Sequence, residues 1–130
     1  MKKIVFMLLI TFTALMADLE TVWVTPKFLN NKMKIIDIRT PSEWKETGII
    51  KGAYPITFFD ERGNFNAEKF VLQLNKVVKK GEKFALICRT GSRTTMVSQF
   101  LANKLGYNVV NLKGGMMKLI HEGYKPVSYK

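Results

Sequence analysis

The sequence predicts a single α/β domain, with a mostly parallel sheet of about five strands and helices on both faces. Short β-branched apolar runs alternate along the chain with segments whose apolar residues recur at helical spacing. This alternation is typical of right-handed βαβ crossovers, which build parallel sheets. The 130 residues can form one small core but not a two-domain enzyme. Sheets of this kind hold their ligand sites at the carboxyl ends of the strands.

The chain begins with a basic and then apolar leader. Lys2–Lys3 precede an uncharged, mostly apolar run over residues 4–15, and Ala17 is a small residue suited to cleavage by a signal peptidase. This pattern predicts a secretory signal peptide over residues 1–17 and a mature domain over residues 18–130. The alternatives are an uncleaved anchor or a buried first helix, but the run is shorter than the ~20 residues of a spanning helix. We therefore expect a periplasmic protein without a stable membrane anchor.

The composition excludes several function classes. Twenty-one basic and ten acidic residues give a formal net charge of +11, which favours anionic partners. The lysines are scattered, so a solvated basic surface is favoured over a nucleic-acid-binding stripe, and no nucleic acid partner is expected. A single cysteine allows neither an intramolecular disulfide nor a cysteine-based zinc site. His121 has no cysteine or histidine at metal-ligand spacing, so we expect a surface residue and no metal site.

The first part of the mature chain carries two strand signals and two helix caps. A short strand is expected over residues 22–24, and Thr25 then caps a short helix. The β-branched run over residues 34–38 is typical of a buried parallel strand. Thr40 and Glu43, three residues apart, predict a capping box at the start of a second helix.

The middle of the chain predicts one longer helix. Residues 52–56 form a brief extended segment, and residues 61–64 are a turn. Asn66 caps the helix that follows, and Gly81 is expected to end it. Its apolar residues fall on one face at helical spacing: Phe70, Val71, Leu74, Val77 and Val78.

The last part repeats the strand and helix alternation. A buried strand is expected over residues 83–87, and another over residues 107–112. An amphipathic helix between them ends at Gly106, and Gly114–Gly115 turn into a final helix closed by Gly123. The residues of the amphipathic helix expected to point inward are Met96, Val97, Phe100, Leu101 and Leu105.

The loop C-R-T-G-S-R, from Cys88 to Arg93, joins a strand to a helix and carries the chemistry. Backbone N–H groups of such a loop can point inward and bind an anion, and the start of a helix adds to the field. Arg89 and Arg93 bring two positive charges, so an electropositive pocket is expected that favours thiolate over thiol. A thiolate is the nucleophile in thiol chemistry. The alternative is a buried structural cysteine, but the flanking arginines favour a functional site.

Four motifs, in this order and spacing, resemble the rhodanese-like domain family over nearly the whole mature chain. They are I-I-D-I-R (35–39), Glu43-Trp44 followed by G-I-I-K-G-A (48–53), C-R-T-G-S-R (88–93) and L-K-G-G (112–115). Two positions depart from the family pattern, because Ile49 stands where histidine is usual and Met117 lies near the place of a frequent tryptophan.

The resemblance implies a role for each residue of the loop. The catalytic cysteine of the family maps onto Cys88. Asp37 and Arg39 match a motif near the site and are expected to be structural rather than catalytic, and Arg39 could pair with Glu43. The expected substrate-binding residues, which include hydroxyls able to hydrogen-bond an anion, are Arg89, Thr90, Gly91, Ser92, Arg93 and Thr94.

The function that the resemblance implies is sulfur transfer by double displacement. Cys88 would take a sulfane sulfur from a small anionic donor, thiosulfate or polysulfide, and carry it as a persulfide. Cyanide, a thiol or a protein acceptor would then remove it. This chemistry requires no metal or organic cofactor.

Three other functions compete with sulfur transfer. Related phosphatases use a loop one residue longer than the four residues between Cys88 and Arg93, and Thr94 cannot hold a phosphate as arginine would. A thiol–disulfide oxidoreductase would need a second cysteine. A non-catalytic rhodanese-like sulfur carrier, sensor or protein-binding module stays open.

Overall fold

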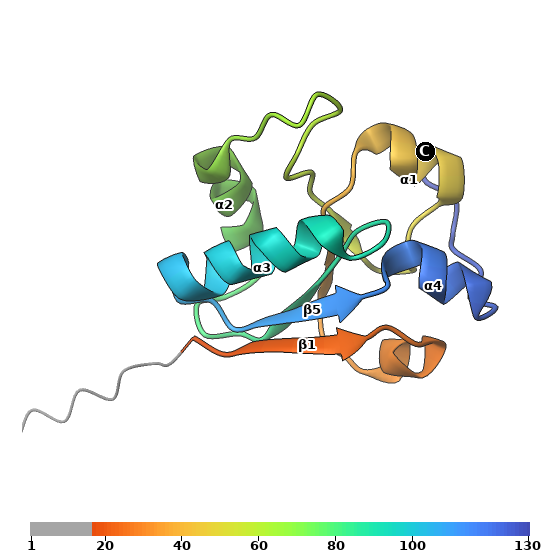
Figure 1. The fold of residues 1–130 in the computed structure, drawn as a ribbon, viewed down its shortest axis with the longest axis horizontal. Coiled ribbons are helices and arrows are strands. Elements are labelled where there is room, and N and C mark those ends of the chain that lie inside the picture. The colour runs from red at the N-terminus through yellow and green to blue at the C-terminus, as the bar shows by residue number, and fades with distance from the viewer. Residues whose placement is uncertain (1–16) are drawn as a thin grey trace, which may run out of the picture.

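A computed structural model describes residues 17–130, and in these residues five strands form one sheet in the order β1-β5-β4-β2-β3 (Figure 1). Every pair of neighbouring strands is parallel, which confirms the predicted fold class. The predicted signal peptide, apart from Ala17, lies outside the described residues, so it stays a prediction. The strands are β1 (Leu19–Trp23), β2 (Ile35–Asp37), β3 (Tyr54–Pro55), β4 (Phe84–Ile87) and β5 (Val109–Lys113).

Helices cover both faces of the sheet, as expected from the βαβ alternation (Figure 1). α2 and α3 pack on one face, and η1 and α4 pack on the other. Within residues 17–130 no helix has the length and apolar character needed to cross a membrane. The helices are η1 (a 3₁₀ helix, Pro26–Asn30), α1 (Pro41–Thr47), α2 (Ala67–Asn75), α3 (Ser92–Leu105) and α4 (Gly115–His121).

The central strand β4 joins the two halves of the core. All four of its residues are fully buried. Phe84 and Leu86 point into the cluster under α2 and α3, whereas Ala85 and Ile87 point into the cluster under α4. Because successive side chains of a strand alternate between faces, a strand buried on both sides must be apolar throughout. Cys88 follows this strand directly and is therefore held at the carboxyl end of the central, fully buried strand.

The predicted helix caps are confirmed. The Thr25 side chain accepts a hydrogen bond from the N–H of Phe28 at the start of η1. Thr40 and Glu43 form the reciprocal capping box of α1, and Asn66 caps α2 by accepting from Lys69. These contacts lie within three residues of each other in sequence, which is why sequence spacing reveals them.

The predicted end of α2 is wrong. The helix ends at Asn75, six positions before Gly81. Beyond Asn75 the backbone tightens, because the N–H of Val77 bonds to the carbonyl of Leu74 at 2.9 Å. Past this turn the carbonyl of Val77 accepts a hydrogen bond from the Lys34 ammonium at 2.8 Å. Val78 still reaches the core as predicted, at 3% exposure.

Two residues predicted to point inward from α3 are exposed. Met96 is 56% exposed and Leu105 is 45% exposed. The face of α3 toward the sheet instead uses positions separated by three and four residues, two of which are small polar side chains. These polar side chains donate hydrogen bonds to the nearby backbone carbonyls of Gly91 and Thr95. The buried residues of this face are Thr94, Val97, Ser98, Leu101 and Ala102.

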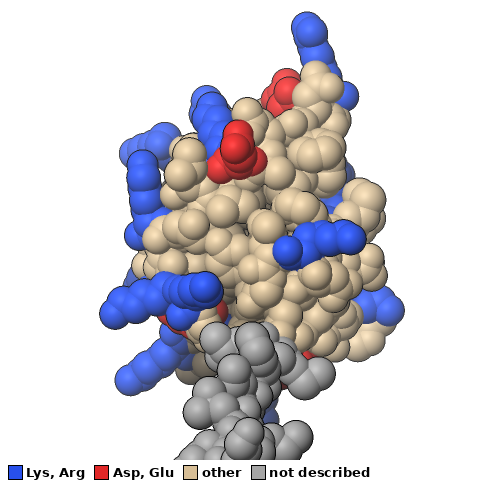
Figure 2. Space-filling model, turned by 90° about the vertical axis from the view of Figure 1, so that its left-hand side faces the viewer, with Lys and Arg blue, Asp and Glu red and all other residues tan. Residues whose placement is uncertain are grey.

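Basic side chains are dispersed over the surface. Figure 2 shows the left-hand side of the view in Figure 1, where Lys and Arg side chains stand apart around an uncharged centre. The drawn face carries no continuous basic stripe, in keeping with the scattered lysines of the sequence.

Candidate active site at the carboxyl end of the sheet

The loop after β4 places the Cys88 sulfur at the start of α3. Gly91 adopts a left-handed conformation, with φ at 103°, which lets the chain turn directly into the helix at Ser92. The N–H of Gly91 donates to Cys88 Sγ at 3.2 Å. The thiol in turn donates to the Thr94 hydroxyl, with 3.6 Å between Sγ and Oγ1. Both contacts involve fully buried groups, so the sulfur is enclosed by its own loop.

The start of α3 offers further hydrogen-bond donors to an anion. The N–H groups of Ser92, Arg93 and Thr94 belong to the first helical turn and donate to no acceptor within residues 17–130. α3 has fourteen residues, so its dipole places partial positive charge at this end. A negative charge on the Cys88 sulfur, or on a sulfur bonded to it, would be stabilised here.

The predicted Gly114–Gly115 turn holds the cysteine loop in place. The N–H groups of Met116 and Met117 donate to the carbonyls of Cys88 and Arg89, at 2.9 and 3.0 Å. Gly115 has a φ of +62°, and a Cβ there would lie 2.4 Å from the Arg89 carbonyl oxygen. Glycine is therefore required by both conformation and space, and the late glycine motif supports the loop rather than the substrate.

Arg93 is paired with Glu43 of α1. Its two terminal nitrogens, Nη1 and Nη2, bind the two carboxylate oxygens at 2.7 and 2.8 Å. Burial raises the pKa of the Glu43 carboxyl, but its hydrogen bonds to Arg93 and Thr40 and the charge of Arg93 outweigh this and lower the pKa. The hydrogen bond to Glu43 is the main cause that raises the pKa of Arg93. The predicted pair of Arg39 with Glu43 is therefore wrong, because Arg93 takes the carboxylate.

Arg39 pairs with Asp37 instead, and both side chains are buried. The guanidinium binds both carboxylate oxygens of Asp37, with Nη2 to Oδ2 at 2.8 Å. It also donates to the Thr47 hydroxyl and the Gly48 carbonyl, at 2.6 and 2.7 Å. These contacts fix the end of α1 to the end of β2. A structural rather than catalytic role for Asp37 and Arg39 stays a prediction.

The remaining loop residues face solvent. Arg89, Thr90 and Ser92 are exposed, and Arg89 has no ion-pair partner among the described residues. Arg89 therefore carries the unneutralised charge of the loop, while the charge of Arg93 is balanced by Glu43.

A hollow of about 540 Å³ adjoins the loop at Arg93. Three carboxylates line it, and one of them, Glu43, is paired with Arg93. Met96, predicted to be in the core, forms part of its wall. Sequence spacing could not link Glu43 to the loop, although its place in a capping box before a buried tryptophan marks it as structurally important. The lining residues are Thr40, Glu43, Phe59, Asp60, Glu61, Gly63, Arg93 and Met96.

Metal ligands do not cluster in the part of the chain that the structure describes. No group of three or more His, Cys, Asp or Glu residues there is placed to hold an ion. His121 is exposed on α4.

Ile49 departs from the family pattern. Its backbone N–H and carbonyl form two hydrogen bonds with the backbone of Val127, both at 2.9 Å, near the carboxyl terminus.

Comparison with known proteins identifies the family. The model of the family described as "Rhodanese-like domain" matches residues 23–122. The "Uncharacterized protein RP600" of Rickettsia prowazekii is 33% identical over 91 residues, covering 67% of this chain and 72% of that protein.

Solved structures agree with this match. A rhodanese-like domain protein from Staphylococcus aureus has a TM-score of 0.59 at 23% identity, and the match covers 84% of this chain and 99% of that one. SSP1007 from Staphylococcus saprophyticus has a TM-score of 0.57 at 29% identity, covering 78% of this chain and 95% of that one. With its five-stranded parallel sheet and its cysteine loop at the carboxyl end of β4, this chain belongs to the rhodanese-like domain family.

Proposed function

We propose that this protein is a sulfurtransferase that moves a sulfane sulfur from an anionic donor to a thiophilic acceptor through a persulfide on Cys88. The observation that carries the proposal is the environment of the Cys88 sulfur. This sulfur accepts a hydrogen bond from the Gly91 N–H at 3.2 Å and lies at the start of α3. Its loop corresponds to the active-site loop of the family. Hydrogen-bond donors and a helix start stabilise negative charge on a sulfur bonded to Cys88.

In the first step the Cys88 thiolate attacks the outer sulfur of thiosulfate. The bond between Sγ and that sulfur forms while the donor's S–S bond breaks, and sulfite leaves with the electron pair. With polysulfide as the donor, a polysulfide shorter by one sulfur leaves instead. Exposed Arg89 attracts the anion, and the N–H groups at the start of α3 stabilise the charged terminal sulfur of the persulfide.

In the second step a nucleophile attacks the terminal sulfur of the persulfide. Cyanide, a thiol or a cysteine of a protein acceptor takes the sulfur, and the electron pair of the broken S–S bond returns to Cys88 as thiolate. The Thr94 hydroxyl accepts from the thiol at 3.6 Å, and by rotating it can donate to the thiolate instead. The hydroxyl can therefore form a hydrogen bond with the sulfur as thiol and as thiolate.

A sulfur carrier without rapid turnover is the second candidate function. Cys88 is completely buried, and Arg93 is held away from free anions by Glu43. Both features would slow the entry of a donor and the departure of sulfur. The leader of the sequence favours the periplasm as the place where either function operates.

Thiocyanate production separates the two candidates. The purified protein is given cyanide with thiosulfate or with polysulfide, and thiocyanate is followed over many equivalents of protein. A sulfurtransferase forms it continuously, and Cys88→Ser forms none. A carrier releases the one equivalent with which it was loaded and then forms thiocyanate only as slowly as the donor reloads it. If neither donor yields thiocyanate, both candidate functions are contradicted.

A further inference from the structure

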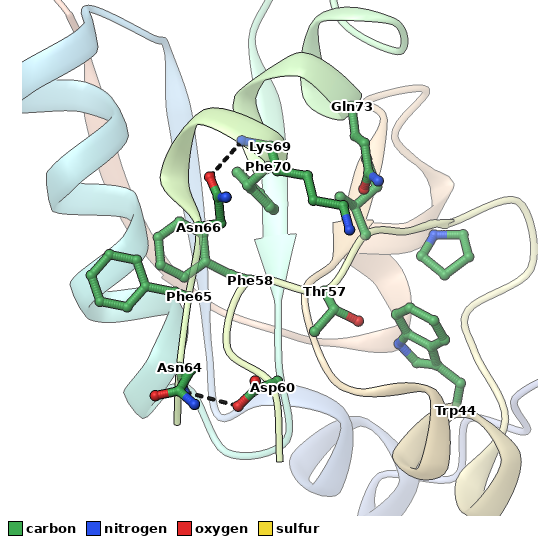
Figure 3. A pocket seen from close by; sticks show the side chains of 12 residues that line it. Trp44, Thr57, Phe58, Asp60, Asn64, Phe65, Asn66, Lys69, Phe70 and Gln73 are labelled. Atoms are coloured by element: carbon green, nitrogen blue, oxygen red, sulfur yellow. Dashed lines mark hydrogen bonds between the residues drawn. The ribbon is translucent and has the colours of Figure 1, made fainter. Parts of the chain in front are cut away.

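A second hollow, of about 440 Å³, lies between α1, the segment after β3, and α2 (Figure 3). No residue of the loop from Cys88 to Arg93 lines it, so sulfur transfer leaves it unexplained. Its apolar wall includes Phe58 and Phe70, whose rings meet edge to face with centroids 4.9 Å apart. We propose that this hollow binds the carboxylate of a small organic monoanion through Trp44, Lys69 and Gln73.

Trp44 carries the first part of the argument. The residue is only 5% exposed, and its indole Nε1–H finds no hydrogen-bond acceptor among residues 17–130. Figure 3 shows the indole nitrogen on the side of the ring that faces Thr57. The Thr57 hydroxyl is already committed, because it donates to the Arg39 carbonyl at 2.7 Å. A buried donor without an acceptor costs free energy, and because the nitrogen itself is covered, the indole must turn slightly toward an acceptor in the hollow to remove that cost.

Two side chains of α2 reach over the same hollow. Lys69 and Gln73 are four positions apart and therefore share one face of the helix. In Figure 3 the Lys69 ammonium and the Gln73 amide both extend to the side of the hollow where Thr57 lies. Both residues are exposed, and within the described residues neither side chain has a hydrogen-bond or ion-pair partner.

The backbone adds a further donor at this edge of the sheet. Ile56 and Phe58 turn their N–H groups toward β2, where they donate to Asp37 and Ile38 at 3.0 and 3.1 Å. The N–H of Thr57, between them, must face the opposite direction and donates to none of residues 17–130. β3 is the last strand of the sheet on this side, so no neighbouring strand covers that N–H.

These donors define the chemistry of the ligand. Indole and ammonium groups only donate, so the group they bind must accept several hydrogen bonds, as a carboxylate does. Lys69 is the one cation and Asp60 the one anion of the lining, which favours a single negative charge over a phosphate. Asp60 is also engaged by its own turn, accepting from Arg62 and Asn64 at 2.9 Å. The aromatic wall would hold an apolar body, and the volume suits a small molecule.

The indole signals of the two tryptophans test this proposal. Proton–nitrogen correlation spectra of the purified protein show one indole N–H for Trp23 and one for Trp44, and Trp23→Phe assigns them. On titration with sodium phenylacetate we expect the Trp44 signal to shift to saturation and the Trp23 signal to stay. Phenylacetamide, the neutral isostere, should bind about tenfold more weakly. A tripeptide ending in phenylalanine, with a free or an amidated carboxyl terminus, shows whether a peptide can supply the carboxylate.

Two matched lysine variants test whether the Lys69 ammonium binds the carboxylate. Lys69→Met should weaken phenylacetate binding about tenfold, since it removes one charge-assisted hydrogen bond. Lys76→Met, at the exposed end of the same helix and outside the hollow, should bind as the wild type does. An unmoved Trp44 signal, equal binding of acid and amide, or equal binding by the two variants would each overturn the proposal. Because the Cys88 loop does not line the hollow, the outcome does not depend on sulfur transfer.

Discussion

The pair of Glu43 and Arg93 should be the main tie between α1 and the cysteine loop, and Glu43→Gln measures it. The two hydrogen bonds, at 2.7 and 2.8 Å, join opposite charges whose side chains are 18% and 23% exposed. At an effective dielectric constant of about 20 the attraction at ~4 Å is about 4 kcal/mol. Exposed pairs retain about 0–1 kcal/mol of this, whereas breaking a buried pair costs about 3–5 kcal/mol.

This partly buried pair falls between those limits, and glutamine keeps one acceptor oxygen. We therefore expect Glu43→Gln to lower the free energy of unfolding by about 2 kcal/mol at pH 7. For a domain of this size the corresponding loss in Tm is roughly 8 °C. Glu46→Gln, on the exposed face of the same helix and without an ion pair among the described residues, is the control and should melt within about 1 °C of wild type.

The pH dependence of this difference follows from the direction of the pKa shift. The folded-state pKa of Glu43 lies below its ordinary value of 4.5, so the carboxylate stabilises the fold fully above that value. The stabilisation is lost as the pH falls through the lowered pKa. Thermal melts should thus show the gap between wild type and Glu43→Gln at pH 7 and its closure in strong acid. A variant that melts like Glu46→Gln at pH 7, or a gap independent of pH, would refute the reasoning.

Three further substitutions probe other parts of the site. Gly115→Ala places a Cβ 2.4 Å from the Arg89 carbonyl oxygen at a φ of +62°, and should lower the free energy of unfolding in urea by about 3 kcal/mol. Gly63→Ala, where the space is open, is the control, and an equally small loss of stability in both variants would contradict this. Arg39→Lys cannot keep the bidentate contact with buried Asp37 and should lower the free energy of unfolding by about 3 kcal/mol in the same assay. An unchanged urea midpoint would show that the Arg39 contacts do not stabilise the fold. Thr94→Val should slow alkylation of the cysteine by iodoacetamide about tenfold at neutral pH, and an unaltered rate would show that the hydroxyl does not act on the sulfur.

The sequence predicted those features that depend on short stretches of chain. The helix caps and the turn into α3 involve residues within a few positions of each other, so spacing alone identifies them. The fully apolar run of β4 fixes its burial on both faces and places Cys88 at a carboxyl end. The fold class and the position of the candidate nucleophile were therefore predictable without any structure.

Contacts between distant segments were not predictable in this way. Glu43 and Arg93 are fifty positions apart, and spacing gives no reason to prefer that pair over Arg39 with Glu43. In the structure Asp37, two positions from Arg39, binds the Arg39 guanidinium, and Arg93 binds Glu43. The hydrogen bond from Lys34 to the carbonyl of Val77, just past the end of α2, likewise joins residues forty-three positions apart.

The measurement that tests the central claim most directly is the intact mass of the purified protein after exposure to a sulfur donor. We expect thiosulfate or polysulfide to add the mass of one sulfur atom to the wild type and none to Cys88→Ser. Cyanide should then remove that mass and release thiocyanate. A wild type that gains no sulfur from either donor would contradict the persulfide on Cys88, and so would a gain that Cys88→Ser shares.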